Sequence, residues 1–206
     1  TYSKQKSSGI ARTFVETAAV DEFGNVVGKS LMDVLKPVVT ITNIKDLFNP
    51  SQAQTLKNFF TYALALRSQH LATRGIESGF ELGDLKAVIQ QFDTPAWRQA
   101  ADELTTWAEH PIKWLERAGG LSPGTADVFR SMNPVYVMMK RAFLDDPAAR
   151  MGTGRLFSSG KPVKAIHGSG RAVIHPLVSM VEQMAQLIAR AHNMRVAGLI
   201  ADLAER

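Results

Sequence analysis

The sequence predicts an all-α protein: a bundle of short helices followed by one long C-terminal helix. Apolar residues recur at spacings of three and four along most of the chain. Prolines and small polar residues stand where helices begin, and only residues 38–44 form a β-branched run. We expect an extended, flexible segment over 1–29, a helical bundle over 30–150, a Gly-rich basic loop over 151–175 and a long packing helix over 176–206.

The composition is that of a globular protein. The chain has 206 residues, of which 45% are hydrophobic and 21% charged, enough for one good core or two small ones. It has no cysteine, which excludes disulfides, thiolate metal sites and cysteine nucleophiles. No apolar run reaches the ~18 residues of a membrane span, so we expect no transmembrane segment. A threonine start and an end within a helical pattern suggest part of a longer chain.

Residues 1–29 are predicted to be weakly ordered. "TYSKQKSSG" is polar, and "DEFGNVVG" is typical of a turn. Strands are not expected beyond a single hairpin. Ser30 is placed to cap a short helix that stops at Pro37.

Cap and proline signals divide the bundle into helices. Asn49 and Pro50 begin the next helix, and Gly75 fits its end. Another helix covers 82–92. Thr94 caps the one after it, which Pro111 is expected to interrupt. A further helix is expected to begin at Ser122 and Pro123. The three tryptophans are expected to anchor the core: Trp97, Trp107 and Trp114.

The last predicted helix is the longest, about 45 Å for thirty residues. Its apolar and small residues form an unbroken seam at spacings of three and four, typical of a helix that packs along its length. The seam consists of Leu177, Met180, Met184, Leu187, Ala191, Met194 and Gly198. Two interpretations are open: the seam packs on the chain's own helices, or on another subunit or another part of the parent protein.

The stretch 151–176 carries two Gly-X-Gly-Arg tetrads but does not fit a nucleotide loop. Phe157 and Val173 stand where a dinucleotide fingerprint needs its third glycine. Pro162 stands where a P-loop needs the hydroxyl that holds magnesium. The stretch is therefore interpreted as a flexible basic loop.

Positive charge gathers in and before this loop, while the whole chain carries a net charge of +5. A stretch of this kind is suited to contact the phosphate backbone of DNA without reading its sequence. The alternative is a solvated surface that only keeps the chain soluble. The candidate phosphate contacts are Arg141, Arg150, Arg155, Lys161, Lys164 and Arg171.

No catalytic or metal-binding pattern is found. The histidines lack zincin spacing, and no carboxylate set has EF-hand spacing. Ser169 lies in no nucleophile motif. We therefore expect no catalytic residue, no metal and no cofactor in this segment. Loop histidines His167 and His175 are more readily explained as solvated or capping groups than as ligands.

Three segments, 48–75, 114–143 and 167–205, resemble in order and spacing a helical region of phage and mobile-element large polyvalent proteins. Short motifs carry the resemblance: a helix with Tyr and Arg, an Asn-X-X-Tyr-Val segment followed by a basic residue, a Gly-Ser-X-Arg turn, an apolar pair before X-Pro, and an Asn-X-Arg pair in a long helix. They fall on Tyr62, Arg67, Asn133, Tyr136, Val137, Arg141, Gly168, Ser169, Arg171, Val173, Ile174, Pro176, Asn193 and Arg195.

The resemblance implies a non-catalytic structural segment of an internal virion or ejection protein. Such proteins are packaged in the virion interior and are delivered into the host cell envelope, where they assist genome delivery. The implied partners are other copies or other segments of the parent protein, other virion proteins, and the DNA phosphate backbone. The alternative is a helical scaffold module of a multidomain phage DNA-processing or antirestriction enzyme.

Overall fold

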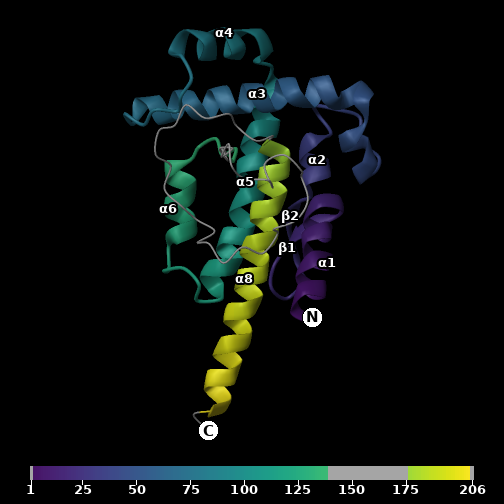
Figure 1. Cartoon of the computed structure of the whole chain (residues 1–206), viewed down its shortest axis with the longest axis vertical. Coiled ribbons are helices and arrows are strands. Elements are labelled where there is room, and N and C mark those ends of the chain that lie inside the picture. Colours follow the sequence, from purple (N-terminus) through teal and green to yellow (C-terminus); the bar gives the residue numbers. More distant parts are fainter. Residues whose placement is uncertain (1, 139–175, 205–206) are drawn as a thin grey trace, which may run out of the picture.

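The computed structural model describes residues 2–138 and 176–204, and their architecture is all-α, as predicted. Helices α5 and α8 lie side by side along the longest axis (Figure 1), with α1 and α2 on one side, α6 on the other, and α3 crossing one end. The helices in chain order are α1 (Tyr2–Glu16), α2 (Leu31–Leu35), the 3-10 helix η1 (Ile44–Phe48), α3 (Pro50–Thr73), α4 (Leu82–Phe92), α5 (Pro95–Arg117), α6 (Thr125–Met132) and α8 (Pro176–Ala204).

The prediction of an extended, flexible segment over 1–29 is wrong for the described residues. Residues 2–16 form α1, and β1 (Ala18–Val20) pairs antiparallel with β2 (Val26–Lys29). The polar first nine residues concealed the helix, whose second half carries the buried Phe14 and Val15. Trp107 Nε1 donates to the Phe14 carbonyl at 3.0 Å, so α5 satisfies a carbonyl in the last turn of α1.

The predicted starts of α2 and α3 are confirmed. Ser30 Oγ accepts the Asp33 N–H at 3.1 Å, and the Asn49 side chain accepts the Ser51 N–H at 3.1 Å before Pro50. Gly75 follows α3 with a φ of +67°, a left-handed conformation that suits glycine best. These signals are local, which is why the sequence alone located them.

The prediction that Pro111 interrupts the helix is wrong, since α5 runs through this residue from Pro95 to Arg117. An internal proline removes one hydrogen bond and crowds the preceding turn. Trp107 and Trp114, which lie on either side of Pro111, are buried in the same core. Their burial stabilises the continuous helix. The core role predicted for these two tryptophans is confirmed.

Helix α6 begins later than predicted, without a cap from Ser122. Its N-cap is Gly124, at a φ of +80° with no side-chain hydrogen bond. The Glu116 carboxylate instead accepts the N–H groups of Gly124 at 2.8 Å and Ala126 at 2.7 Å. A carboxylate from α5 thus supplies the negative charge that a helix N-terminus favours.

An aromatic cluster joins α3, α4 and α5. Trp97 stacks on Phe92 with ring centroids 5.6 Å apart and meets the edge of Phe59. Tyr62 donates to Asp93 at 2.7 Å, and Arg98 binds the same carboxylate with two nitrogens. The hydrogen bonds from Arg98 and then from Tyr62 hold the pKa of Asp93 below its ordinary value.

Gly28 marks a close approach between the hairpin and α5. A Cβ added there would collide with the imidazole ring of His110. We expect Gly28→Ala to lower the free energy of unfolding by about 1–3 kcal/mol through overpacking, measured by urea denaturation. Gly83→Ala is the matched control: it meets nothing within 4 Å in α4, so we expect it to stabilise by up to about 1 kcal/mol. A stabilising Gly28→Ala would contradict this packing.

His110 makes stability sensitive to pH near neutrality. Burial, followed by the charge of Lys113, lowers the pKa of His110 from its ordinary 6.5. As the pH falls through 6.5, the unfolded chain takes up this proton before the folded chain does. Stability is therefore complete above the unfolded pKa and declines below it. We expect His110→Gln to reduce the fall in Tm between about pH 7.5 and 6; an unchanged fall would contradict this role.

Candidate functional site

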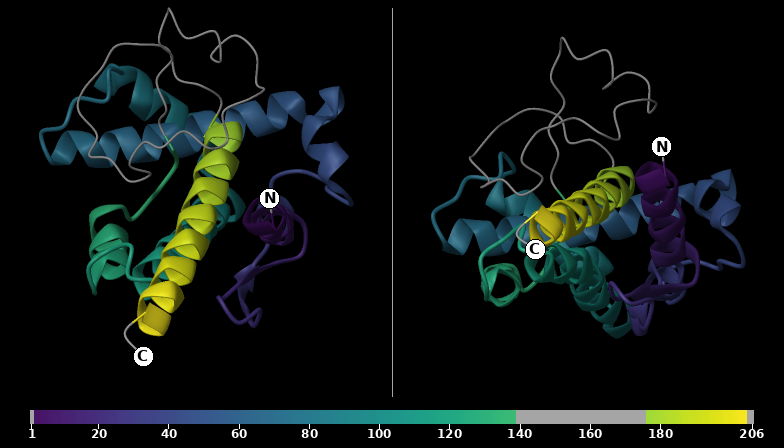
Figure 2. Two further views of the ribbon diagram at one scale, coloured as in Figure 1. Left: turned by 60° about the horizontal axis from the view of Figure 1, so that its bottom comes forward. Right: turned by 90° about the horizontal axis from the view of Figure 1, so that it is seen from below.

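Helix α8 changes character near its middle. From Pro176 to His192 every residue is buried or half-buried, and from Asn193 to Ala204 every residue is exposed. We call residues 193–204 the distal half. Its turns extend past the other described helices (Figures 1 and 2).

The predicted seam divides at the same point. The interpretation that it packs on the chain's own helices is confirmed for its first part, which lies against α1 and α5. It fails for its last part, because Met194 is 37% exposed and Gly198 lies in the exposed distal half. The buried members are Leu177, Met180, Met184, Leu187 and Ala191.

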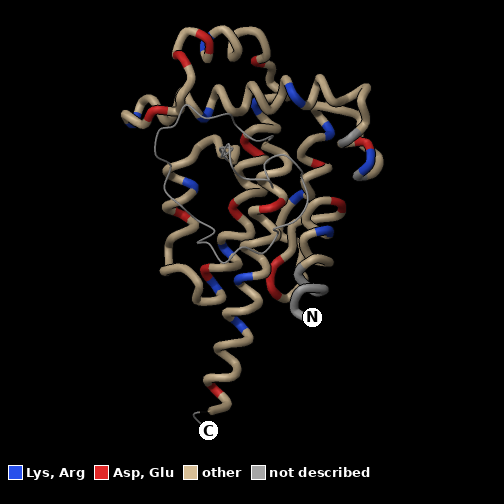
Figure 3. Tube along the Cα trace, viewed as in Figure 1, with Lys and Arg blue, Asp and Glu red and all other residues tan. Residues whose placement is uncertain are grey.

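The last nine residues of the distal half are apolar on nearly every side. Residues 196–204 read "VAGLIADLA" and contain one charged residue, Asp202. Figure 3 shows this end of α8 almost free of charged positions. A helix that is apolar all round is normally buried, so this surface differs from an ordinary solvated helix end.

Four large side chains concentrate on one face of the distal half, at spacings of three, four and seven. Their exposed fractions rise toward the helix end: 50% for Val196, 57% for Leu199, 62% for Ile200 and 72% for Leu203. We call these four residues the apolar quartet. Contiguous exposed apolar residues of this size mark interaction sites.

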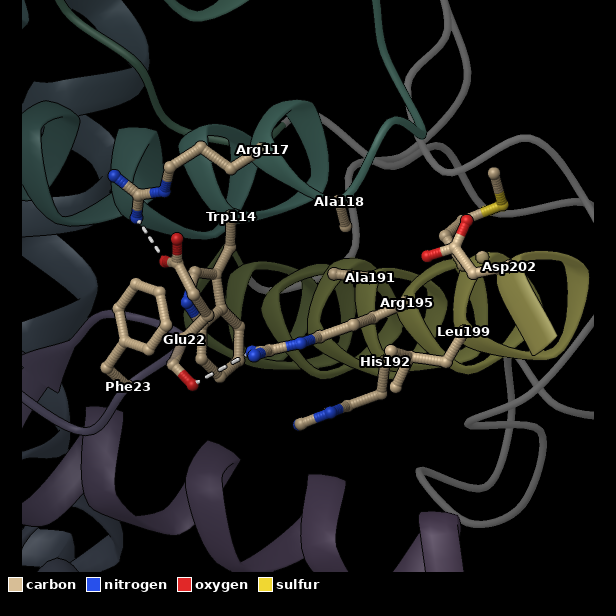
Figure 4. Close-up of a pocket in the computed structure, with 12 residues that line it drawn as sticks. Glu22, Phe23, Trp114, Arg117, Ala118, Ala191, His192, Arg195, Leu199 and Asp202 are labelled. Atoms are coloured by element: carbon tan, nitrogen blue, oxygen red, sulfur yellow. Dashed lines mark hydrogen bonds and ion pairs between the residues drawn. The ribbon is translucent and has the colours of Figure 1, made fainter. Parts of the chain in front are cut away.

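A pocket of about 380 Å³ lies where the distal half leaves the body. Three elements line it (Figure 4): α8, the end of α5 and the turn of the hairpin. Trp114 forms its inner wall, and Phe23 projects into it from the turn. The indole Nε1 of Trp114 is buried without a hydrogen-bond partner.

Polar contacts connect the hairpin turn to α5 and α8. Arg117 pairs with the Glu22 carboxylate at 2.9 Å. Arg195 donates to the Glu22 carbonyl at 3.3 Å and lies over the Phe23 ring, 5.5 Å from its centroid. Trp114 meets His192 edge-on at 5.3 Å. The start of the distal half is therefore held in place, while its apolar quartet stays exposed.

The sequence alone missed this site. The sequence pattern predicts a turn at Phe23 and a core position for Trp114, and nothing in their spacing places them together. One signal was present: the nine residues 196–204 are too apolar for a free helix end.

The candidate phosphate contacts and the Gly-rich basic loop lie outside the described residues. This holds for Arg141, Arg150, Arg155, Lys161, Lys164 and Arg171. Their contact with DNA stays a prediction.

The residues that carry the family resemblance are partly brought together. The guanidinium of Arg67 lies over the Tyr136 ring, 4.4 Å from its centroid. Tyr62 binds Asp93 instead, and Arg195 binds the hairpin turn. The positions from Arg141 to Ile174 lie outside the described residues.

Within residues 2–138 and 176–204, no group of three or more His, Cys, Asp or Glu side chains is arranged to hold a metal ion. No helix of this part is both long and apolar enough to cross a membrane. Comparisons with protein-family models, curated proteins and solved structures found no match.

Proposed function

We propose that this chain is a non-catalytic structural segment that assembles with a second copy through the distal half of α8. One observation carries the proposal: an apolar helix end that no described part of the chain covers. Burying four large apolar side chains contributes about 25 cal/mol per Å² removed from water. That is the principal stabilising contribution available to this surface.

A second copy is the partner because the apolar quartet is symmetric along the helix. Reversing the direction about the midpoint between Leu199 and Ile200 exchanges these two residues and also exchanges Val196 with Leu203. Two distal halves laid antiparallel therefore present large apolar residues to each other at every level, as an isologous contact requires. The two bodies then lie at opposite ends of the pair, so only the exposed turns meet.

The experiment is sedimentation equilibrium over roughly 1–200 µM, because a contact of this size supports a weak association. We expect the unmodified chain to dimerise with concentration, and the Leu199→Glu/Leu203→Glu double variant to stay monomeric. The matched control places the same charges at apolar residues of similar exposure, Leu82→Glu/Val128→Glu, and should still dimerise. A monomer at every concentration in the unmodified chain would contradict the proposal.

We place this assembly in an internal virion or ejection protein of the phage type, which assists genome delivery through the host envelope. The sequence resemblance of residues 45–205 supports this placement. It predicts that antibodies against the chain detect the parent protein inside purified virions, and in the host envelope fraction after infection. Detection only in infected cells and never in virions would count against it.

A further inference from the structure

Arg67 carries a buried positive charge that no described residue neutralises. The side chain lies on α3 and is 3% exposed. Neither Nε nor Nη1 has a hydrogen-bond partner, and no described carboxylate lies within ion-pair distance. Buried charges in proteins are normally paired and hydrogen-bonded, since an unpaired one is expensive to remove from water.

Among the described residues, the guanidinium contacts an aromatic ring. Its carbon lies 4.4 Å from the Tyr136 centroid. Such a contact stabilises the cation over the face of the ring. It leaves Nε and Nη1, whose hydrogens lie in the guanidinium plane, without acceptors. These donors are therefore available to the oxygens of an oxyanion.

Hydrogen bonds to two helices hold Tyr136, whose ring lies under the Arg67 guanidinium, in place. The Tyr136 N–H donates to Thr105 Oγ1 of α5 at 2.7 Å, and its hydroxyl donates to Gln183 Oε1 of α8 at 2.8 Å. One turn before Gln183, on the same face of α8, the hydroxyl of Ser179 is buried and has no hydrogen-bond partner. A second unused donor thus lies on the side of α8 that faces Tyr136.

The surroundings of Arg67 are basic. His70 and Arg74 follow it at three and seven residues, and both bind the carbonyl of Met132, at 3.2 and 3.1 Å. Burial first, and then the charge of Arg74, lowers the pKa of Arg67. Arg74 therefore adds a second positive charge where α3 meets residues 132–136.

We propose that Arg67 anchors a binding site for a small oxyanion, a phosphate or a carboxylate, with the Ser179 hydroxyl as a further donor. The planar fork of Arg matches two oxygens of either group. Because Arg67 is almost fully buried, the ion enters when residues 133–138, which have no regular secondary structure, open locally. The proposal does not rest on the assembly of α8.

The test compares thermal unfolding in sodium phosphate, in sodium acetate and in sodium chloride of equal ionic strength. At about 20 mM phosphate, we expect the Tm to exceed that in chloride by roughly 2–4 °C. Acetate tells the two sources of oxyanion apart: an equal rise indicates a carboxylate as the natural ligand, and a smaller rise a phosphate. Titration calorimetry of the unmodified chain with phosphate should show one site.

Arg67→Met gives the sharper result. Without an oxyanion, we expect it to melt at the same or a higher temperature than the unmodified chain, since it removes an unpaired charge. With phosphate, its Tm should not rise. The control Arg12→Met changes an arginine that is exposed, and should keep the full response. No oxyanion effect beyond chloride, or an equal effect in Arg67→Met, would overturn the site.

Discussion

Trp107→Ala lowers the free energy of unfolding by about 3–5 kcal/mol, a large part of the stability of a domain of this size. The side chain is 2% exposed and lies in the core shared by α1, α5 and α8. Removing the indole leaves a cavity that surrounding helices fill only in part. It also leaves the Phe14 carbonyl without the donor that satisfies it. Urea denaturation followed by circular dichroism measures the change.

Trp107→Phe separates the two contributions. It keeps most of the ring in place but removes the hydrogen bond to Phe14, and we expect a smaller loss of about 1–3 kcal/mol. A loss below 1 kcal/mol for Trp107→Ala would mean that α1 does not pack on α5 as described.

Removing the part of α8 beyond Arg195 abolishes self-association without unfolding the body. A chain that ends at Arg195 keeps the buried seam from Leu177 to Ala191 and the contacts of Arg195 with the hairpin turn, and it loses the apolar quartet. Because the removed residues are exposed, we expect its free energy of unfolding to change by less than about 1 kcal/mol. Its dimer dissociation constant should rise by at least about 100-fold.

Measuring both quantities on the same variant makes this prediction discriminating. A fall in stability comparable to that of Trp107→Ala would show that the distal half packs on its own body. Unchanged dimerisation would place the contact between copies on another surface.

Much of the fold follows from local signals in the sequence. Capping residues and flanking prolines located the starts of α2, α3 and α5, and periodicity located α8. The failures have physical causes. Helix α1 was missed because its first residues are polar and its stability comes from packing on α8 and from the contacts of Phe14 with two tryptophans of α5. Pro111 did not end α5 because tertiary burial outweighed the local preference of proline.

The candidate site could be predicted only in part. The seam has the same spacing in both halves of α8, so periodicity could not show that Ala191 is buried and Gly198 is exposed. That difference depends on where the partner helices end, which is a property of the tertiary structure. The Arg67–Tyr136 contact joins residues 69 positions apart and likewise needed the fold.

Disulfide formation between single-cysteine variants tests the central claim most directly, because the chain has no cysteine of its own. In the antiparallel pair Val196 lies opposite Leu203, whereas equivalent positions lie about 10 Å apart along the axis, at 1.5 Å for each of seven residues. That is too far for a disulfide. We predict that Val196→Cys mixed with Leu203→Cys gives a cross-linked heterodimer, and that neither variant cross-links alone. Cross-linking of each variant with itself but not in the mixture, or no cross-link at all, would contradict the account.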